Sequence, residues 1–211
     1  MEKRERKNVY KVYNKIAVWF SQNRAPGLRE KGYLDFILAN IPANGIILDL
    51  GCGTGKPILE YLVSRKMDVI GVDASDEMLN IAKAAFPLTS FLLQDMRLLD
   101  LNRKFDAITA WNSLFHLSAT DQQTMFPIFK NHLKPMGLLL FTSGTERGEA
   151  WGMNGGEHLF HASLDTKDYE QLLIDNNFKV LKHVVNDPDC AEATVWIAQY
   201  CPTKNDQKYH F

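Results

Sequence analysis

Three glycines alternate in one short stretch of the sequence, at Gly51, Gly53 and Gly55 within "ILDLGCGTGKP" (47–57). Glycine has no Cβ, so it adopts positive φ angles and lets another molecule approach the backbone closely. A loop of this kind between a strand and a helix can also offer backbone N–H groups to a ligand. We therefore expect the loop to bind a ligand, and its spacing bears on which one.

The spacing does not fit the two common phosphate-binding loops. The phosphate loop of nucleotide hydrolases needs Gly at position 50 and Ser or Thr at 57, where this chain has Leu50 and Pro57. The dinucleotide fingerprint G-x-G-x-x-G needs a third Gly at position 56, where this chain has Lys56. The loop is therefore predicted not to hold a phosphate chain.

Acidic residues end the next two strand-like segments along the chain. Asp73 closes "DVIGVD", 22 residues after Gly51, and Asp95 closes "SFLLQD". A carboxylate at the first position can accept hydrogen bonds from both hydroxyls of a ribose. Parallel strands place their carboxyl ends at one edge of the sheet, so a nucleoside without phosphates is the predicted ligand.

The stretch "LDLGCGTG" (48–55) resembles the first motif of class I S-adenosylmethionine-dependent methyltransferases, hxDxGxGxG. "FDAITAWNSLFHL" (105–117) resembles the family's fourth motif. "LKPMGLLLFT" (133–142) resembles its "LKPGGxLLF" segment, with Met136 in place of one glycine. The resemblance covers about residues 45–200 and implies a small-molecule methyltransferase.

The resemblance also implies roles for single residues. Asp49 would orient the glycine loop and favour the ammonium end of the cofactor, Asp73 would bind the ribose, and Asp95 would accept from the adenine amine with Met96 against the ring. The cofactor is S-adenosyl-L-methionine, and the expected binding set is Trp19, Asp49, Gly51, Cys52, Gly53, Gly55, Asp73, Ala74, Met78, Asp95, Met96 and Trp111.

Few side chains are candidates for the chemistry itself. His116 either takes a proton from the acceptor or packs beside the cofactor sulfur. Aromatic faces at Trp19, Phe20 and Trp111 are candidates for stabilising the sulfonium cation. Arg24 either pairs with the methionine carboxylate or is a solvated surface residue.

The acceptor is predicted to be a small molecule. After the fourth strand the chain reads Trp111-Asn112-Ser113, without the Pro-Pro of nucleic-acid amino-methyltransferases and without the carboxylate of metal-dependent catechol-type enzymes. Two loops, 144–163 and 186–192, are expected to rise over the sheet edge. Their candidate pocket walls are Trp151, Met153, His158, Phe160 and Cys190, while His158 and His161 are read as loop histidines and no metal site is expected.

Strand-like and helical stretches must alternate to position these residues. Apolar runs at 45–50, 68–73, 90–95, 105–111 and 137–143 are separated by helical patterns, which predicts an α/β sheet with parallel crossovers. The resemblance implies a three-layer sandwich and a seven-stranded, mostly parallel Rossmann-like sheet in the order 3-2-1-4-5-7-6, the last strand antiparallel. One domain is expected, made of a helical cap (1–44), a cofactor-binding core (45–143), a lid-like loop (144–163) and a C-terminal helix and β-hairpin (164–211).

The composition is that of a cytoplasmic globular protein. Net charge is −1 at pH 7, so neither a nucleic-acid nor a membrane partner is expected. Three cysteines without a pattern favour reduced thiols. The oligomeric state stays open, as do two alternatives: a non-enzymatic cofactor-binding or regulatory protein, and an NAD-dependent oxidoreductase.

Overall fold

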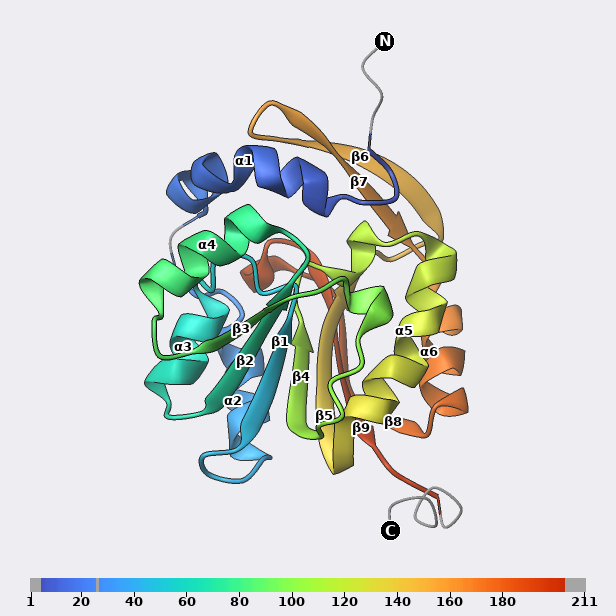
Figure 1. Ribbon diagram of the computed structural model, residues 1–211. Coiled ribbons are helices and arrows are strands. Elements are labelled where there is room, and N and C mark those ends of the chain that lie inside the picture. Colours follow the sequence, from blue (N-terminus) through green and yellow to red (C-terminus); the bar gives the residue numbers. More distant parts are fainter. Residues whose placement is uncertain (1–4, 26, 204–211) are drawn as a thin grey trace.

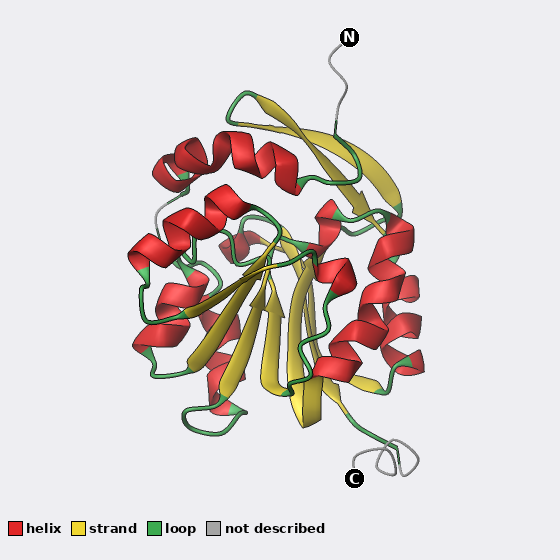
Figure 2. Cartoon of the chain, in the orientation of Figure 1, coloured by secondary structure: helices red, strands yellow, loops and turns green. Residues whose placement is uncertain are grey.

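A seven-stranded sheet forms the centre of the computed structural model, which describes residues 5–25 and 27–203 (Figures 1 and 2). The strand order is β3-β2-β1-β4-β5-β9-β8, and β9 runs antiparallel to its neighbours β5 and β8. The strands are β1 (Ile46–Leu50), β2 (Asp68–Asp73), β3 (Ser90–Leu93), β4 (Phe105–Ala110), β5 (Leu133–Ser143), β8 (Phe178–Asp187) and β9 (Ala193–Tyr200). The predicted order is confirmed, with the terminal hairpin in the last two places.

Helices cover both faces of the sheet and make three layers (Figure 1). One face packs against α2, α3 and α4, and the other packs against α5 and α6. A further helix, α1, lies across the carboxyl ends of the strands. The helices are α1 (Tyr10–Asn23), α2 (Lys31–Ala39), α3 (Ile58–Ser64), α4 (Asp76–Ala85), α5 (Ala119–His132) and α6 (Thr166–Asp175), with short turns η1 (Met96–Leu98), η2 (Leu114–His116) and η3 (Pro188–Cys190).

The apolar runs in the sequence explain this layering. Successive strand residues point to opposite faces, so Ile47 packs in the cluster with Leu62 of α3, while Leu48 packs in the cluster with Phe126 of α5. All four side chains are fully buried. A strand buried on both faces must be apolar throughout, which is why these strands read as continuous hydrophobic runs.

The segment 144–163 differs from the expected irregular loop. It forms an antiparallel hairpin of β6 (Gly148–Asn154) and β7 (Glu157–Ser163), separate from the main sheet. Its two turn residues, Gly155 and Gly156, have φ of +55° and +81°, the backbone that a two-residue hairpin turn requires. The Gly-Gly pair was the signal for this turn, and the prediction of a loop without regular structure was wrong.

The hairpin and α1 lie together above the carboxyl edge of the sheet (Figure 1). Val9 and Val12 at the start of the chain pack against Leu159, Phe160 and Ala162 of β7 in a small apolar cluster. This cluster joins two segments far apart in the sequence into one cap. Among the described residues, no helix has the length and apolar character needed to cross a bilayer.

Candidate functional site

The glycine loop follows β1 and is held in place by hydrogen bonds between backbone groups. Gly51 and Cys52 both donate their N–H groups to the carbonyl of Val72, at 2.7 and 3.1 Å, and Gly55 donates to the carbonyl of Cys52 at 2.9 Å. Gly51 has φ +78°, and a Cβ there would lie 2.3 Å from the Cβ of Ser113. Position 51 therefore has to be glycine for Ser113, which hydrogen-bonds to the carbonyl of Leu50, to approach the loop.

Asp73 joins the loop to the start of α4. One carboxylate oxygen accepts from the backbone N–H of Gly53 and the other accepts from that of Ser75, both at 2.8 Å. Burial raises the pKa of Asp73, and these N–H groups oppose the shift. Because Gly53 donates to Asp73, four loop N–H groups, those of residues 51, 52, 53 and 55, are taken up within the protein.

Asp49 lies beneath the loop. Its side chain accepts a hydrogen bond from the hydroxyl of Thr109 at 2.7 Å, and the residue is 3% exposed. Burial raises the pKa of Asp49 to about 6, although the Thr109 hydroxyl and the charge of Arg24 lower it. Burying an ionised carboxylate costs free energy, so its presence at this position indicates that the charge of Asp49 has a role.

Arg24 is partly buried, with 31% of its side chain exposed, unlike a fully solvated surface arginine. Its guanidinium lies 3.6 Å from the carboxylate of Glu30, which is itself 5% exposed and has one oxygen without a hydrogen bond among the described residues. Burial lowers the pKa of Arg24, while the carboxylates of Glu30 and Asp49 oppose this. A cation and two carboxylates thus lie close together near the glycine loop.

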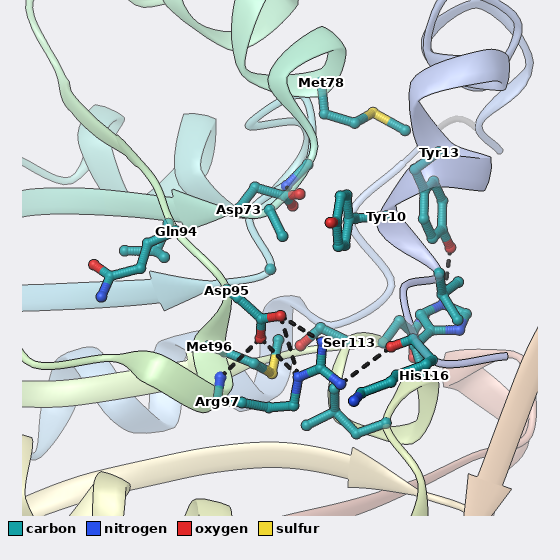
Figure 3. A pocket seen from close by; sticks show the side chains of 18 of the residues that line it. Tyr10, Tyr13, Asp73, Met78, Gln94, Asp95, Met96, Arg97, Ser113 and His116 are labelled. Atoms are coloured by element: carbon teal, nitrogen blue, oxygen red, sulfur yellow. Dashed lines mark hydrogen bonds and ion pairs between the residues drawn. The ribbon is translucent and has the colours of Figure 1, made fainter. Parts of the chain in front are cut away.

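A cavity of about 120 Å³ opens beside the loop, and we call it the glycine-loop cavity. Its walls come from the carboxyl ends of β1, β2, β3 and β4 and from α1 above them (Figure 3). It is lined by Lys7, Val9, Tyr10, Tyr13, Phe20, Gly51, Gly53, Val72, Asp73, Ala74, Met78, Gln94, Asp95, Met96, Arg97, Asn112, Ser113, His116 and Leu117.

The structure brings most of the predicted site residues to this cavity. Those in its lining are Gly51, Gly53, Asp73, Ala74, Met78, Asp95, Met96 and the candidate base His116. Those outside its lining are Trp19, Asp49, Cys52, Gly55 and Trp111. For both sets, a role in cofactor binding stays a prediction.

The residues outside the lining have structural surroundings of their own. The ring of Trp111 packs against Tyr33, 5.8 Å between centroids. A Cβ at Gly55 would lie 2.8 Å from Phe86, so this glycine makes room for the ring. Trp19 is 42% exposed and lies against the hairpin turn rather than the cavity.

Arg97 organises one side of the cavity, and the sequence analysis missed it. Its guanidinium forks onto the carboxylate of Asp95 and reaches Asp121 at 3.2 Å (Figure 3). It also donates to the carbonyl of Lys7 and the side-chain oxygen of Asn8, at 3.1 and 3.2 Å. The pKa of Asp95 is lowered by Arg97 against the effect of burial. Arg97 therefore ties the N-terminal residues to the cavity.

His116 is hydrogen-bonded through both ring nitrogens. Nδ1 lies 2.9 Å from the carbonyl of Phe160, and Nε2 lies 2.9 Å from the hydroxyl of Tyr13 (Figure 3). A carbonyl only accepts, so Nδ1 carries the proton and Nε2 accepts from Tyr13. Burial lowers the pKa of His116 to about 4, so the ring is neutral at pH 7. His116 thereby connects α1 to the hairpin.

A second cavity, of about 600 Å³, lies at the base of the β6–β7 hairpin, and we call it the hairpin cavity. Asn112 lines both cavities, so the two adjoin. Its lining is Asn112, Phe115, Thr142, Ser143, Gly144, Thr145, Glu146, Arg147, Gly148, Glu149, Ala150, His161, Ala162, Ser163, Cys190, Ala191, Glu192 and Ala193.

The predicted pocket walls are only partly in this lining. Cys190 lines the hairpin cavity, as does His161, which had been read as an ordinary loop histidine. Trp151, Met153, His158 and Phe160 lie outside both linings. Strand alternation accounts for part of this, because the side chains of Phe160 and His161 point to opposite sides of β7. No metal-binding group of three or more His, Cys, Asp or Glu occurs in the described part of the chain.

Residues 47–137 match the methyltransferase domain family Methyltransf_25. The chain is also similar to the putative methyltransferase YqeM of Bacillus subtilis, 38% identical over 113 residues that cover 50% of this chain and 45% of that protein. A similar match is the dTDP-3-amino-3,4,6-trideoxy-alpha-D-glucopyranose N,N-dimethyltransferase of Streptomyces venezuelae, 31% identical over 50% of this chain and 45% of that protein. The matched part thus spans less than half the length of these relatives.

Solved structures share the whole fold at low identity. A S-adenosylmethionine-dependent methyltransferase from Clostridium acetobutylicum superposes with a TM-score of 0.70 at 21% identity, over 90% of this chain and all of that one. The amino pentose methyltransferase CalS10 of Micromonospora echinaspora gives a TM-score of 0.70 at 18% identity, over 95% of this chain and all of that one. The Rossmann-like methyltransferase fold inferred from the motifs is thereby confirmed.

Proposed function

Because residues 47–137 match a methyltransferase domain and the chain has the fold of S-adenosylmethionine-dependent methyltransferases, we propose that it transfers a methyl group to a small molecule. When bound, S-adenosylmethionine supplies the electrophilic methyl group on a sulfonium. The protein's contribution is to position the two reactants and exclude water. The observation that carries the proposal is the cavity that Asp73 and Asp95 line together with the glycine loop.

The residues at this cavity fit a nucleoside without phosphates. The N–H groups of residues 51, 52, 53 and 55 are all used internally, so they are not free to hold a pyrophosphate, which speaks against the NAD alternative. Asp73 keeps lone pairs for the ribose hydroxyls, since each oxygen accepts one backbone N–H. Asp95 and Met96 would meet the adenine.

The amino-acid arm of the cofactor also has matching groups nearby. The guanidinium of Arg24 would pair with the carboxylate of the arm, and the carboxylates of Asp49 and Glu30 suit its ammonium. These charges are costly to bury when unpaired, and a zwitterionic ligand offsets that cost. Of the two readings of Arg24, the structure supports the one in which it faces the ligand.

The hairpin cavity is the proposed acceptor site. It adjoins the glycine-loop cavity at Asn112. Two similar proteins are named for small amino-sugar substrates, and another is named as a tRNA methyltransferase of Saccharomyces cerevisiae. The net charge of −1 gives the chain no overall excess of positive charge of the kind that RNA binding uses, which supports a small acceptor. A cytoplasmic location remains a prediction.

Calorimetry with S-adenosylmethionine, its demethylated product and NAD tests the cofactor assignment. Asp73→Asn should weaken S-adenosylmethionine binding by about 1.5–3 kcal/mol, because the ribose loses its ionised partner. Asp76→Asn, an exposed neighbour in the first turn of α4, is the matched control and should bind normally. Unchanged affinity in a folded Asp73→Asn protein, or preference for NAD, would contradict the proposal.

Turnover separates an enzyme from a binding protein. Label from the methyl group of S-adenosylmethionine should appear on a member of a metabolite panel. Tight cofactor binding with no transfer to any member would favour the non-enzymatic alternative.

A further inference from the structure

His161 of β7 faces the hairpin cavity with its ring open to it. The ring lies 4.8 Å from that of His116 and 5.2 Å from that of Phe115, centroid to centroid. The residue opposite His161 in the hairpin is Ala150, and a Cβ on Gly152, two residues further along β6, would lie 2.8 Å from Cε1 of His161, so this glycine makes room for the ring. Neither ring nitrogen of His161 has a hydrogen-bond partner in the described part of the chain.

The neighbouring His116, in contrast, has no free ring nitrogen. Its Nδ1 donates to Phe160 and its Nε2 accepts from Tyr13, so both nitrogens are engaged. A general base needs a lone pair within reach of the proton it takes. Of the two neighbouring histidines, His161 is the one with such a lone pair, and it lines the proposed acceptor cavity.

The charges around the hairpin cavity favour a cation. Arg147 pairs with Asp168 at 2.7 Å, and Glu149 pairs with Arg6, so these charges are compensated. Glu146 and Glu192 also line the cavity, and neither side-chain carboxylate has a hydrogen-bond or ion-pair partner in the part of the chain that the structure describes. Two uncompensated carboxylates attract an ammonium group and repel an anionic acceptor.

We propose, building on the function proposed above, that the acceptor is a small amine and that His161 is the catalytic residue that receives its proton. The bound ammonium group first gives one N–H proton to the free ring nitrogen of His161, and this proton passes from there to solvent through the hairpin cavity. The lone pair left on nitrogen forms a bond to the methyl carbon, while the carbon–sulfur bond breaks and its electron pair stays on sulfur. The methylated product leaves as an ammonium ion. Burial lowers the pKa of His161, so the ring is unprotonated and ready at neutral pH.

Matched acceptors test the chemical class. D-Glucosamine, D-glucose and D-glucuronate share one ring, and 2-phenylethylamine, 2-phenylethanol and phenylacetate share another. Labelled methyl transfer by the wild-type protein should reach the amine members. Transfer only to alcohols or carboxylates, or no transfer to any member by a protein that binds S-adenosylmethionine, would overturn the amine assignment.

Charge removal tests the role of the carboxylates. The double variant Glu146→Gln/Glu192→Gln should raise KM for the amine about tenfold, with little change in kcat, because the carboxylates act on binding. An unchanged KM would count against them.

Histidine variants test the proton acceptor on whichever amine is turned over. His161→Asn should lower kcat about 10²-fold, at the low end of general-base effects, and His161→Gln should behave alike. His158→Asn is the control, since that histidine is on the same strand but lines neither cavity. Normal calorimetric affinity for S-adenosylmethionine in His161→Asn would show that the cofactor site is intact.

The pH profile distinguishes a base from a structural residue. Wild-type kcat should fall on the acid side as His161 becomes protonated, below the usual range for histidine, and this limb should vanish in His161→Asn. Among the other titratable or charged groups, His116 packs against the ring, and the hairpin-cavity lining contains Cys190, Arg147 and the glutamates 146, 149 and 192. The pKa values of His116 and Cys190, about 4 and about 11, leave both uncharged at neutral pH. The limb should persist in the glutamine double variant.

The result that overturns the assignment is specific. A limb that survives in His161→Asn but disappears in His116→Asn would identify His116 as the base. If the wild-type protein does not bind S-adenosylmethionine at all, the proposed methyltransferase function is refuted. Failure of the His161 assignment and failure of the proposed function can therefore be told apart.

Discussion

The two adjoining cavities are built in contrasting ways. In the glycine-loop cavity almost every polar group is already engaged: Asp73 holds two backbone N–H groups, Asp95 holds Arg97, and His116 holds Tyr13. In the hairpin cavity, Glu146 and His161 line the wall without hydrogen-bond partners among the described residues. The named groups of the first cavity are thus held in place by the protein itself, whereas those of the second are not.

The lining residues of the two cavities also come from different parts of the chain. Apart from the N-terminal residues 7–20, the glycine-loop cavity is lined from within 47–137, the segment that matches the methyltransferase domain. The hairpin cavity takes all of its lining except Asn112 and Phe115 from residues beyond 137. The glycine-loop cavity is therefore built mostly from the segment that matches the methyltransferase domain, and the hairpin cavity mostly from residues beyond it.

The largest expected effect is at the glycine loop. Gly51→Ala should destabilise the fold by about 4 kcal/mol, because the new Cβ would meet Ser113 at 2.3 Å and the residue must keep φ at +78°. Gly53→Ala is the matched control, since its φ is +53° but no atom lies within 4 Å of the added Cβ; its cost should be about 1 kcal/mol. Urea unfolding measures both, and equal losses would mean that the loop is not tightly packed.

Asp49 should make the stability of the ligand-free protein depend on pH. Folding raises the pKa of its carboxyl from 3.8 to about 6, so the native state binds a proton that the unfolded state has released. The contribution of Asp49 to the free energy of unfolding is therefore greatest below about pH 4. It falls by up to about 3 kcal/mol as the pH rises to about 6. Asp49→Asn removes this dependence.

Unfolding of Asp49→Asn should accordingly match wild type near pH 4 and exceed it by about 2–3 kcal/mol at pH 7. The variant should also bind S-adenosylmethionine more weakly, because the ammonium loses a carboxylate. A constant difference in unfolding free energy from pH 4.5 to 7.5 would show that Asp49 has no perturbed titration.

Two arginines, one from each cavity, allow the cavities to be compared through smaller losses of stability. Arg97 holds Asp95 and Asp121 with its side chain 14% exposed, whereas Arg147 holds Asp165 and Asp168 with its side chain 50% exposed. Arg97→Gln should cost about 2 kcal/mol, because removing it leaves a partly buried carboxylate without its partner. Arg147→Gln should cost less than about 0.5 kcal/mol, because solvent screens an exposed pair.

Hydrogen exchange would extend this test to the N-terminal residues. In Arg97→Gln the amides near Lys7 and Asn8 should exchange faster, since Arg97 donates to both residues. Similar stability losses in the two arginine variants would contradict the contrast between the cavities.

The sequence predicted the central sheet because the strands are apolar on both faces and end in recognisable groups. At the start of α4, the Ser75 hydroxyl accepts a hydrogen bond from the N–H of Met78 and so caps the helix. The hairpin was missed because β6 and β7 pack only partly against the core, so their alternation is weak in the sequence. Arg97 was missed because its partners at residues 7, 8 and 121 are distant along the chain.

By itself, the sequence determined the predicted ligand-binding edge of the sheet. The loop with Gly51 and the strand-end carboxylates Asp73 and Asp95 could be recognised because they depend on residues that are close together in the sequence. Tertiary structure alone decided which histidine has a free ring nitrogen. His116 and His161 lie side by side because η2 and β7 meet beneath α1, and the hydrogen bonds that engage one ring and leave the other open arise from contacts across more than forty residues.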